Sequence, residues 1–181
     1  DGSPVYSPDG KYIAYRMQKV PGYESDLFRI ALYARKTGSS RIITNQFDNW
    51  IDDLKWDKNS KSIYFTGEVK GNEPVFTINI KNEKITQLSG DRAIGDFAPD
   101  FKGYLYFTAS TTGKPQAMYR QKMSDKKETQ LTFFNKELED KVDIRPAETM
   151  WIDGVDGDKI EVFIVKPHDF DPNKKYPLIL N

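Results

Sequence analysis

The sequence predicts an all-β fold: a partial β-propeller of about three four-stranded blades, followed by a β-hairpin linker that enters a further domain. Three observations predict it. An aromatic residue recurs at a nearly fixed distance before a hydrophobic strand, a pair of one hydrophobic and one hydroxyl residue recurs in step with it, and the pattern changes after residue 147. Internal repeats of about 40–45 residues are typical of propeller blades.

Each predicted blade carries an aromatic residue, a turn and a strand in that order. The aromatic residue precedes the strand's first aliphatic residue by seven positions in two copies and by eight in the third, in the pairs Tyr6 and Ile13, Trp56 and Ile63, and Phe97 and Leu105. The segments between them, "SPDGKY", "DKNSKS" and "APDFKGY", are rich in residues that favour tight turns.

The second marker sets the length of the repeat. It is Ile43-Thr44, Leu88-Ser89 and Leu131-Thr132, spaced by 45 and then 43 residues. These intervals predict a propeller portion over residues 1–147, with blades at approximately 5–50, 51–95 and 96–147. Propellers have ~4–8 blades, so three do not close a ring, and we expect further sequence or a second copy of the chain to cover the open edges.

Alternation along the strands supports blades packed on both sides. Ile13, Tyr15 and Met17 fall on one face of their strand, and Tyr12, Ala14 and Arg16 on the other. Apolar residues on both faces are expected of a blade strand that lies between neighbouring blades. The segments that follow, "FRIALYAR", "PVFTINI" and "QAMYRQK", are suited to pair with these strands as meanders.

Residues 148–181 predict a hinge. Two strands, at 148–152 and 159–166, flank a connection rich in Gly and Asp that suits a hairpin. A polar loop bounded by prolines follows, and "LILN" then predicts the first, buried strand of another domain.

Composition narrows the function classes. Lysine and arginine equal aspartate and glutamate at 27 each, which argues against a nucleic-acid partner. No apolar run approaches the ~18 residues of a membrane span. With no cysteine and one histidine, the sequence argues against a zinc site, while a site for a hard cation stays conceivable. We expect no cofactor. The absence of cysteine fits any compartment.

The turn "SPDGK" at 7–11, followed by an Ile-x-Tyr strand, resembles the blade motif of prolyl oligopeptidase-family serine peptidases and of TolB-like proteins. The order of segments strengthens the resemblance, because propeller units precede "GDKIEVFIVKP" and "DPNKKYPLILN", which look like the hinge into that family's α/β-hydrolase domain. The segment "PGYESD" at 21–26 further resembles dipeptidyl-peptidase V and acylaminoacyl-peptidase-like members.

The resemblance implies a parent enzyme that hydrolyses short peptides with a serine nucleophile on a G-x-S-x-G turn. These 181 residues hold no such pentapeptide, so we expect this portion to be inactive alone. The resemblance implies that its role is to gate the access of peptides to the hydrolase domain. His168, without a nucleophile, is expected to be a solvated loop residue. The resemblance favours a periplasmic or secreted protein, with a cytoplasmic one also open. The alternative function is a free-standing TolB-like propeller that binds protein partners.

The sharpest site hypothesis concerns the segment around Pro21-Gly22, which interrupts two strands and predicts a projecting connection. An exopeptidase must recognise a charged amino terminus, and a carboxylate beside a tyrosine would provide a charge-assisted hydrogen bond. The candidate anchor residues are therefore Glu24, Tyr23 and Asp26. In the alternative, Glu24 forms an ion pair with a nearby arginine, such as Arg16 or Arg29.

Three other patterns have ordinary structural interpretations that we favour. "DGVDGD" at 153–158 departs from calcium-loop spacing and suits a hairpin turn, and "ELED" at 137–140 suits a solvated turn. Five aromatic residues would suit a stacking platform for sugars or bases, but their recurrence with the repeat favours blade core; they are Trp50, Trp56, Tyr64, Tyr104 and Tyr106.

Overall fold

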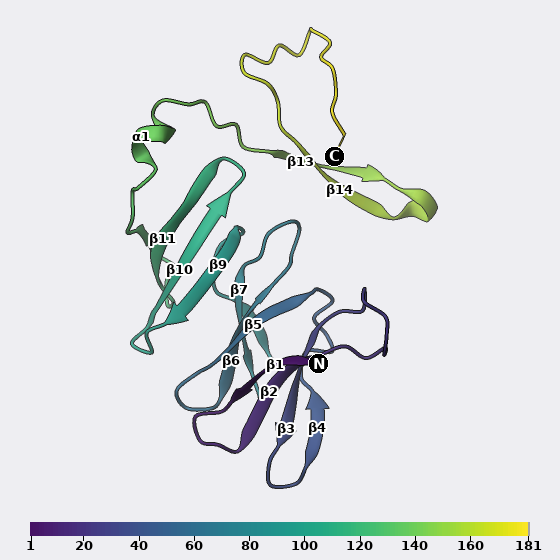
Figure 1. Ribbon diagram of the computed structural model, residues 1–181, viewed down its shortest axis with the longest axis vertical. Coiled ribbons are helices and arrows are strands. Elements are labelled where there is room, and N and C mark those ends of the chain that lie inside the picture. The colour runs from purple at the N-terminus through teal and green to yellow at the C-terminus, as the bar shows by residue number, and fades with distance from the viewer. Residues whose placement is uncertain (181) are drawn as a thin grey trace. The chain divides into compact units, whose positions relative to one another are not determined.

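The computed structural model describes residues 1–180 and is built almost entirely of antiparallel sheets (Figure 1). Three four-stranded sheets follow one another along the chain, each with its strands in sequence order. The first contains β1 (Gly2–Tyr6), β2 (Tyr12–Met17), β3 (Arg29–Ala34) and β4 (Ser39–Ile42). The second contains β5 (Ile51–Trp56), β6 (Ser62–Gly67), β7 (Val75–Asn79) and β8 (Ile85–Gln87), and the third β9 (Ala93–Pro99), β10 (Tyr104–Thr111), β11 (Lys114–Lys122) and β12 (Glu128–Gln130). The predicted four-stranded meanders are confirmed.

The recurring hydroxyl residue has one structural role in all three sheets. Its side-chain oxygen accepts a hydrogen bond from the backbone N–H of a residue 14 positions earlier, in or at the start of the third strand. The pairs are Thr44 with Ile30 at 2.9 Å, Ser89 with Val75 at 2.8 Å, and Thr132 with Met118 at 2.9 Å. Each bond satisfies a strand N–H just beyond the point where the fourth strand ends.

Hydrophobic side chains from the first two sheets form one core. Ala14, Ile30 and Leu32 of the first sheet pack with residues of the second sheet that include Ile63 and Phe65. Phe47, Phe65 and Phe76 form an aromatic cluster in this core, with ring centroids 5.0–5.5 Å apart. A second core joins the second and third sheets, where Val75 of the second sheet packs with residues of the third.

Polar contacts between sheets accompany the two cores. Arg16 on β2 forms an ion pair with Asp52 on β5, and Lys55 on β5 forms one with Asp96 on β9 at 2.6 Å. The two aspartates occupy matching positions, since each is paired in register with a threonine of the next strand, Thr66 or Thr108 respectively. The first and second sheets thus each present a cation to the first strand of the sheet that follows.

The predicted aromatic residues occupy two environments. Trp56 is buried in the first core and Tyr64 packs against the second, while Trp50 meets Phe28 edge to face at 5.0 Å. Tyr104 and Tyr106 lie partly exposed on β10, alternating with the buried Leu105 and Phe107. The prediction that these aromatic residues form the core of the blades therefore fits Trp56 and Tyr64 better than Tyr104 and Tyr106.

The chain divides into two compact units. The first holds residues 1–110 and 116–133, and the second holds Thr111–Pro115 together with the chain from Phe134 onward. Within the second unit, the turn between β10 and β11 contacts the segment before β13, because Thr112 Oγ1 accepts a hydrogen bond of 2.9 Å from the Ala147 N–H. The predicted domain boundary between residues 147 and 148 stays a prediction.

The hairpin of the second unit forms where the sequence places it. β13 (Glu148–Asp153) pairs with β14 (Lys159–Ile164), and a short 3-10 turn (Val155–Gly157) connects them. Asp156 and Gly157 both have positive φ, 60° and 87°, as a type I′ turn requires. The segment "ELED" overlaps the one-turn helix α1 (Lys136–Glu139), whose side chains are solvated.

The strand expected at "LILN", as the start of a further domain, is not formed within the described residues. Leu178–Leu180 form no strand and are exposed, while Asn181 lies outside the described residues. A buried strand needs neighbours on both edges and both faces, and the described part of the second unit offers none at this point.

Candidate functional site

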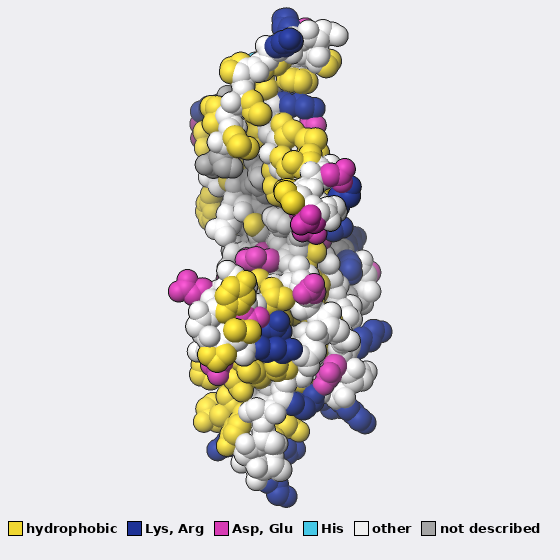
Figure 2. Space-filling model, turned by 90° about the vertical axis from the view of Figure 1, so that its right-hand side faces the viewer, with side chains coloured by type: hydrophobic (Ala, Val, Ile, Leu, Met, Phe, Trp, Pro, Cys, Tyr) yellow, Lys and Arg dark blue, Asp and Glu magenta, His cyan; other side chains and the backbone are white. Residues whose placement is uncertain are grey.

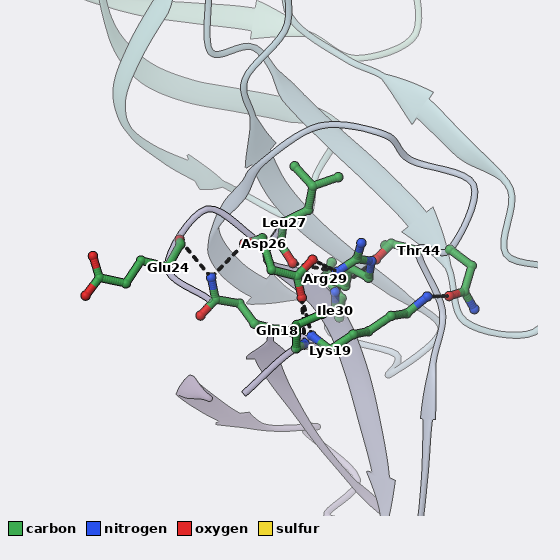
Figure 3. Close-up of polar contacts among 10 residues, drawn as sticks. Gln18, Lys19, Glu24, Asp26, Leu27, Arg29, Ile30 and Thr44 are labelled. Atoms are coloured by element: carbon green, nitrogen blue, oxygen red, sulfur yellow. Dashed lines mark hydrogen bonds and ion pairs between the residues drawn. The ribbon is translucent and has the colours of Figure 1, made fainter. Parts of the chain in front are cut away.

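The candidate site is the connection between β2 and β3, residues 18–28 (Figure 3). It leaves the first sheet at Met17 and returns at Arg29, so its ends are fixed by a strand pair. Pro21 and Gly22 form a tight turn in which the Tyr23 N–H donates to the Val20 carbonyl oxygen at 3.3 Å. Gly22 has a φ of 75°, as the third residue of a type II turn after proline requires.

Asp26 holds the two ends of this connection together. Its carboxylate accepts hydrogen bonds from the backbone N–H groups of Lys19 and Val20, the latter at 3.0 Å, and pairs with Arg29 at 3.0 Å. Hydrogen bonding to Val20, followed by Arg29, lowers the pKa of Asp26 from 3.8 to about 2. These contacts occupy both carboxylate oxygens, so Asp26 shapes the loop.

Gln18 also stabilises this loop through hydrogen bonds. Its side-chain amide donates to the backbone carbonyl oxygens of Glu24, at 3.1 Å, and of Asp26, at 2.6 Å. The tip of the loop is thus tied to the end of β2 by one side chain. Sequence reasoning missed this residue, although a polar amide beside a Pro-Gly turn is a common way to satisfy turn carbonyl groups.

Glu24 and Tyr23 occupy the tip. Both are exposed, with 56% of Tyr23 accessible to solvent. In Figure 3 the Glu24 carboxylate points away from the bonded network, and it has no side-chain partner among residues 1–180. Arg16 and Arg29 pair with Asp52 and Asp26 instead, so the alternative ion pair to Glu24 is not formed.

A half-buried carboxyl group occurs in the equivalent connection of the second sheet. Glu73, just before β7, accepts a hydrogen bond from the Thr66 hydroxyl at 2.8 Å. Burial, with contributions from Asp52 and Glu68, raises the pKa of Glu73 above its usual value of 4.5. The sequence gives no signal for this, because the effect depends on residues brought together by the fold.

The remaining candidates lie elsewhere. His168, in the loop after β14, contacts Asp143 and Asp169, the latter at 3.1 Å, and is 69% exposed in its side chain. Hydrogen bonds from His168 and Arg145 lower the pKa of Asp143. In the described part of the chain, no three acidic or histidine side chains are grouped to hold a metal ion, and no helix is long and apolar enough to cross a membrane.

Solved structures identify the class of fold as a β-propeller. The acylaminoacyl peptidase of Pyrococcus horikoshii matches 92% of this chain with a TM-score of 0.73 and 20% identity, over 25% of its own length. The β-propeller domain of the Trilobed protease from Pyrococcus furiosus matches 70% with a TM-score of 0.54 and 21% identity, over 36% of its length. TolB from Acinetobacter baumannii matches 94% with a TM-score of 0.51 and 21% identity, over 39% of its length. The predicted fold class is confirmed.

Sequence comparison points to particular relatives. Dipeptidyl-peptidase 5 of Porphyromonas gingivalis is 32% identical over 181 residues, which are 99% of this chain and 26% of the relative. Dipeptidyl-peptidase 5 of Schizosaccharomyces pombe is 25% identical, over 97% of this chain and 26% of the relative. The chain matches no family model. The predicted resemblance to dipeptidyl peptidases is confirmed, and the chain spans about a quarter of the length of these relatives.

Proposed function

We propose that this chain is the non-catalytic propeller portion of a serine exopeptidase that hydrolyses short peptides. The observation that carries the proposal is its similarity to dipeptidyl-peptidase 5 along 99% of its residues, combined with a propeller fold. The catalytic serine would follow this portion, on a G-x-S-x-G turn that residues 1–181 do not contain. The chain alone would be inactive and would control which peptides reach the hydrolase domain.

Within that function, Glu24 anchors the amino terminus of the substrate and Tyr23 flanks it. Glu24 suits this role because its carboxylate is exposed, while the backbone that carries it is fastened through Gln18 and Asp26. A pre-ordered loop loses less conformational entropy when it binds a ligand. Asp26, whose two carboxylate oxygens are bonded within the loop, supports Glu24 instead.

The test is kinetic and uses the full-length enzyme. With Glu24→Gln, we expect kcat/KM for a dipeptide substrate with a free amino terminus to fall about 10- to 100-fold, since a charge-assisted hydrogen bond contributes roughly 1.5–3 kcal/mol. The N-acetylated form of the same substrate should be hydrolysed equally by both enzymes. Glu139→Gln, on the exposed helix α1, is the matched control. An unchanged preference for the free amine would remove Glu24 from the site.

A free-standing TolB-like scaffold is the second candidate, favoured by the structural match to TolB over 94% of this chain. A fluorophosphonate that labels active-site serines distinguishes the two functions. We expect the native polypeptide to be labelled at a serine C-terminal to residue 181. A polypeptide that resists labelling and hydrolyses no peptide would support the scaffold.

A further inference from the structure

A groove lined by both polar and apolar groups lies between the first and second sheets, at the end where the β5–β6 and β7–β8 turns lie. Its volume is about 690 Å³, within the range of small-molecule sites. Tyr12 and Arg41 of the first sheet line one side, and residues of the second sheet line the other: Ser60, Lys61, Asn79, Ile80, Lys81 and Asn82. The groove is thus formed by two sheets that already pack together.

The acceptor atoms of the groove are already used within the protein. Asn79 Oδ1 accepts from the backbone N–H groups of Lys81 and Asn82, and Asn82 Oδ1 accepts from that of Lys84. Ser60 Oγ accepts from the Asp9 N–H at 3.0 Å. These bonds shape the β7–β8 turn and join the two sheets, and they leave few acceptors for a ligand.

The remaining polar groups are hydrogen-bond donors. The side-chain N–H groups of Asn79 and Asn82, the hydroxyl hydrogen of Ser60 and the ammonium groups of Lys61 and Lys81 have no partner among residues 1–180. Arg41 adds a guanidinium group that pairs with Glu83 and donates to the Ile80 carbonyl at 2.6 Å. Figure 2 shows Lys and Arg side chains at the lower end of the molecule, where the β3–β4 turn lies in Figure 1.

We propose that this groove binds a multiply charged oxyanion, with Lys61 and Lys81 supplying charge and Asn79, Asn82 and Ser60 supplying directed donors. Phosphate and carboxylate groups share the required chemistry, because both carry several acceptor oxygens and negative charge. Tyr12 offers a partly exposed ring, stacked on Trp56 with centroids 6.5 Å apart, as an apolar wall. A bound anion would contact both sheets and strengthen their interface. Binding here does not depend on peptidase activity.

Calorimetric titration of the full-length protein tests the proposal at an ionic strength of about 20 mM, where screening is weak. One arm uses sodium tripolyphosphate and the other citrate, to distinguish phosphate from carboxylate ligands. We expect saturable binding of at least one anion, with one site per chain, and a higher unfolding temperature in its presence. Absence of saturable binding in both arms would overturn the proposal.

Three variants locate the site. Lys61→Gln with Lys81→Gln should weaken binding at least tenfold, and so should Asn82→Asp, which keeps the oxygen that accepts from Lys84 but replaces the donor with an anionic oxygen. Lys102→Gln with Lys127→Gln removes the same charge from turns of the third sheet and should change binding less than twofold. Equal weakening in this control would show nonspecific attraction and overturn the assignment. Thermal unfolding of each variant without anion verifies that it is folded.

Discussion

The Trp56 indole N–H donates a hydrogen bond of 3.1 Å to the backbone carbonyl oxygen of Val5. Trp56 ends the first strand of the second sheet, and Val5 lies on the first strand of the first sheet. The bond therefore connects the first strands of two consecutive sheets, within the core that both sheets share. It gives a recurring aromatic residue a specific role in assembly.

Trp56→Phe should reduce the free energy of unfolding of the chain by about 1–2 kcal/mol, because the Val5 carbonyl loses a buried partner. Urea unfolding followed by far-ultraviolet circular dichroism measures the change. Trp151→Phe is the matched control, since Trp151 is half exposed on β13, and it should cost under about 0.5 kcal/mol. Equal effects of the two substitutions would contradict an inter-sheet role for Trp56.

Thr44→Val should cost about 1–3 kcal/mol, because it leaves the Ile30 N–H unsatisfied at a fully buried site. Thr132 makes the same bond to Met118, but Thr132 is only partly buried and Met118 is exposed, so water can replace the lost hydroxyl. Thr132→Val should therefore be close to neutral in the same unfolding measurement. Similar costs at both positions would show that burial does not decide the value of this bond.

Gly67→Ala tests how tightly the aromatic cluster is packed. A Cβ atom at Gly67 would lie 2.7 Å from Cζ of Phe47, whose ring is held against Phe65 and Phe76. Because the ring has little freedom to move, the substitution should destabilise the chain by about 1–3 kcal/mol. Phe47→Leu in the same chain should recover part of this loss, as a double-mutant cycle would measure. Simple additivity of the two changes would contradict the predicted clash.

The pH dependence of stability should report the hydrogen bonds of Asp26. Its pKa is lowered to about 2 in the folded chain, against 3.8 without them. The carboxylate therefore stabilises the fold above about pH 4, and this contribution is lost as the pH falls toward 2. The difference in unfolding free energy between the wild type and Asp26→Asn should shrink over that range. A difference that stays constant from pH 5 to pH 2 would contradict the lowered pKa.

The repeat could be predicted because it depends on residues that lie close together in the sequence. Aromatic, turn and hydroxyl residues recur in sequence, and the structure places Thr44, Ser89 and Thr132 in one role with the same spacing of 14 residues. The hairpin could be predicted for the same reason, since Asp156 and Gly157 specify its turn locally. By contrast, "LILN" has the composition of a buried strand but lacks neighbouring strands in the described structure, so the strand predicted for a further domain stays a prediction.

The site could be predicted only in part. The position of the projecting loop follows from Pro21 and Gly22, but the roles of its carboxylates depend on which backbone N–H groups and arginines approach them. Asp26 and Glu24 are alike in chemistry and two residues apart, yet one is bonded on both oxygens and the other is solvated. Arg16 forms its ion pair with Asp52, which belongs to another sheet. The sequence near the loop therefore does not indicate that Arg16 is unavailable to Glu24.

The ion pairs from Arg16 to Asp52 and from Lys55 to Asp96 run in one direction along the chain, from each sheet to its successor. Such head-to-tail coupling makes the sheets modular: a duplicated or deleted unit whose ends fall between the cation and the next aspartate would still join its new neighbour correctly. Proteins built this way can change their number of repeats in a single genetic event. The number of sheets can thereby change without redesign of the contacts at any single junction between them.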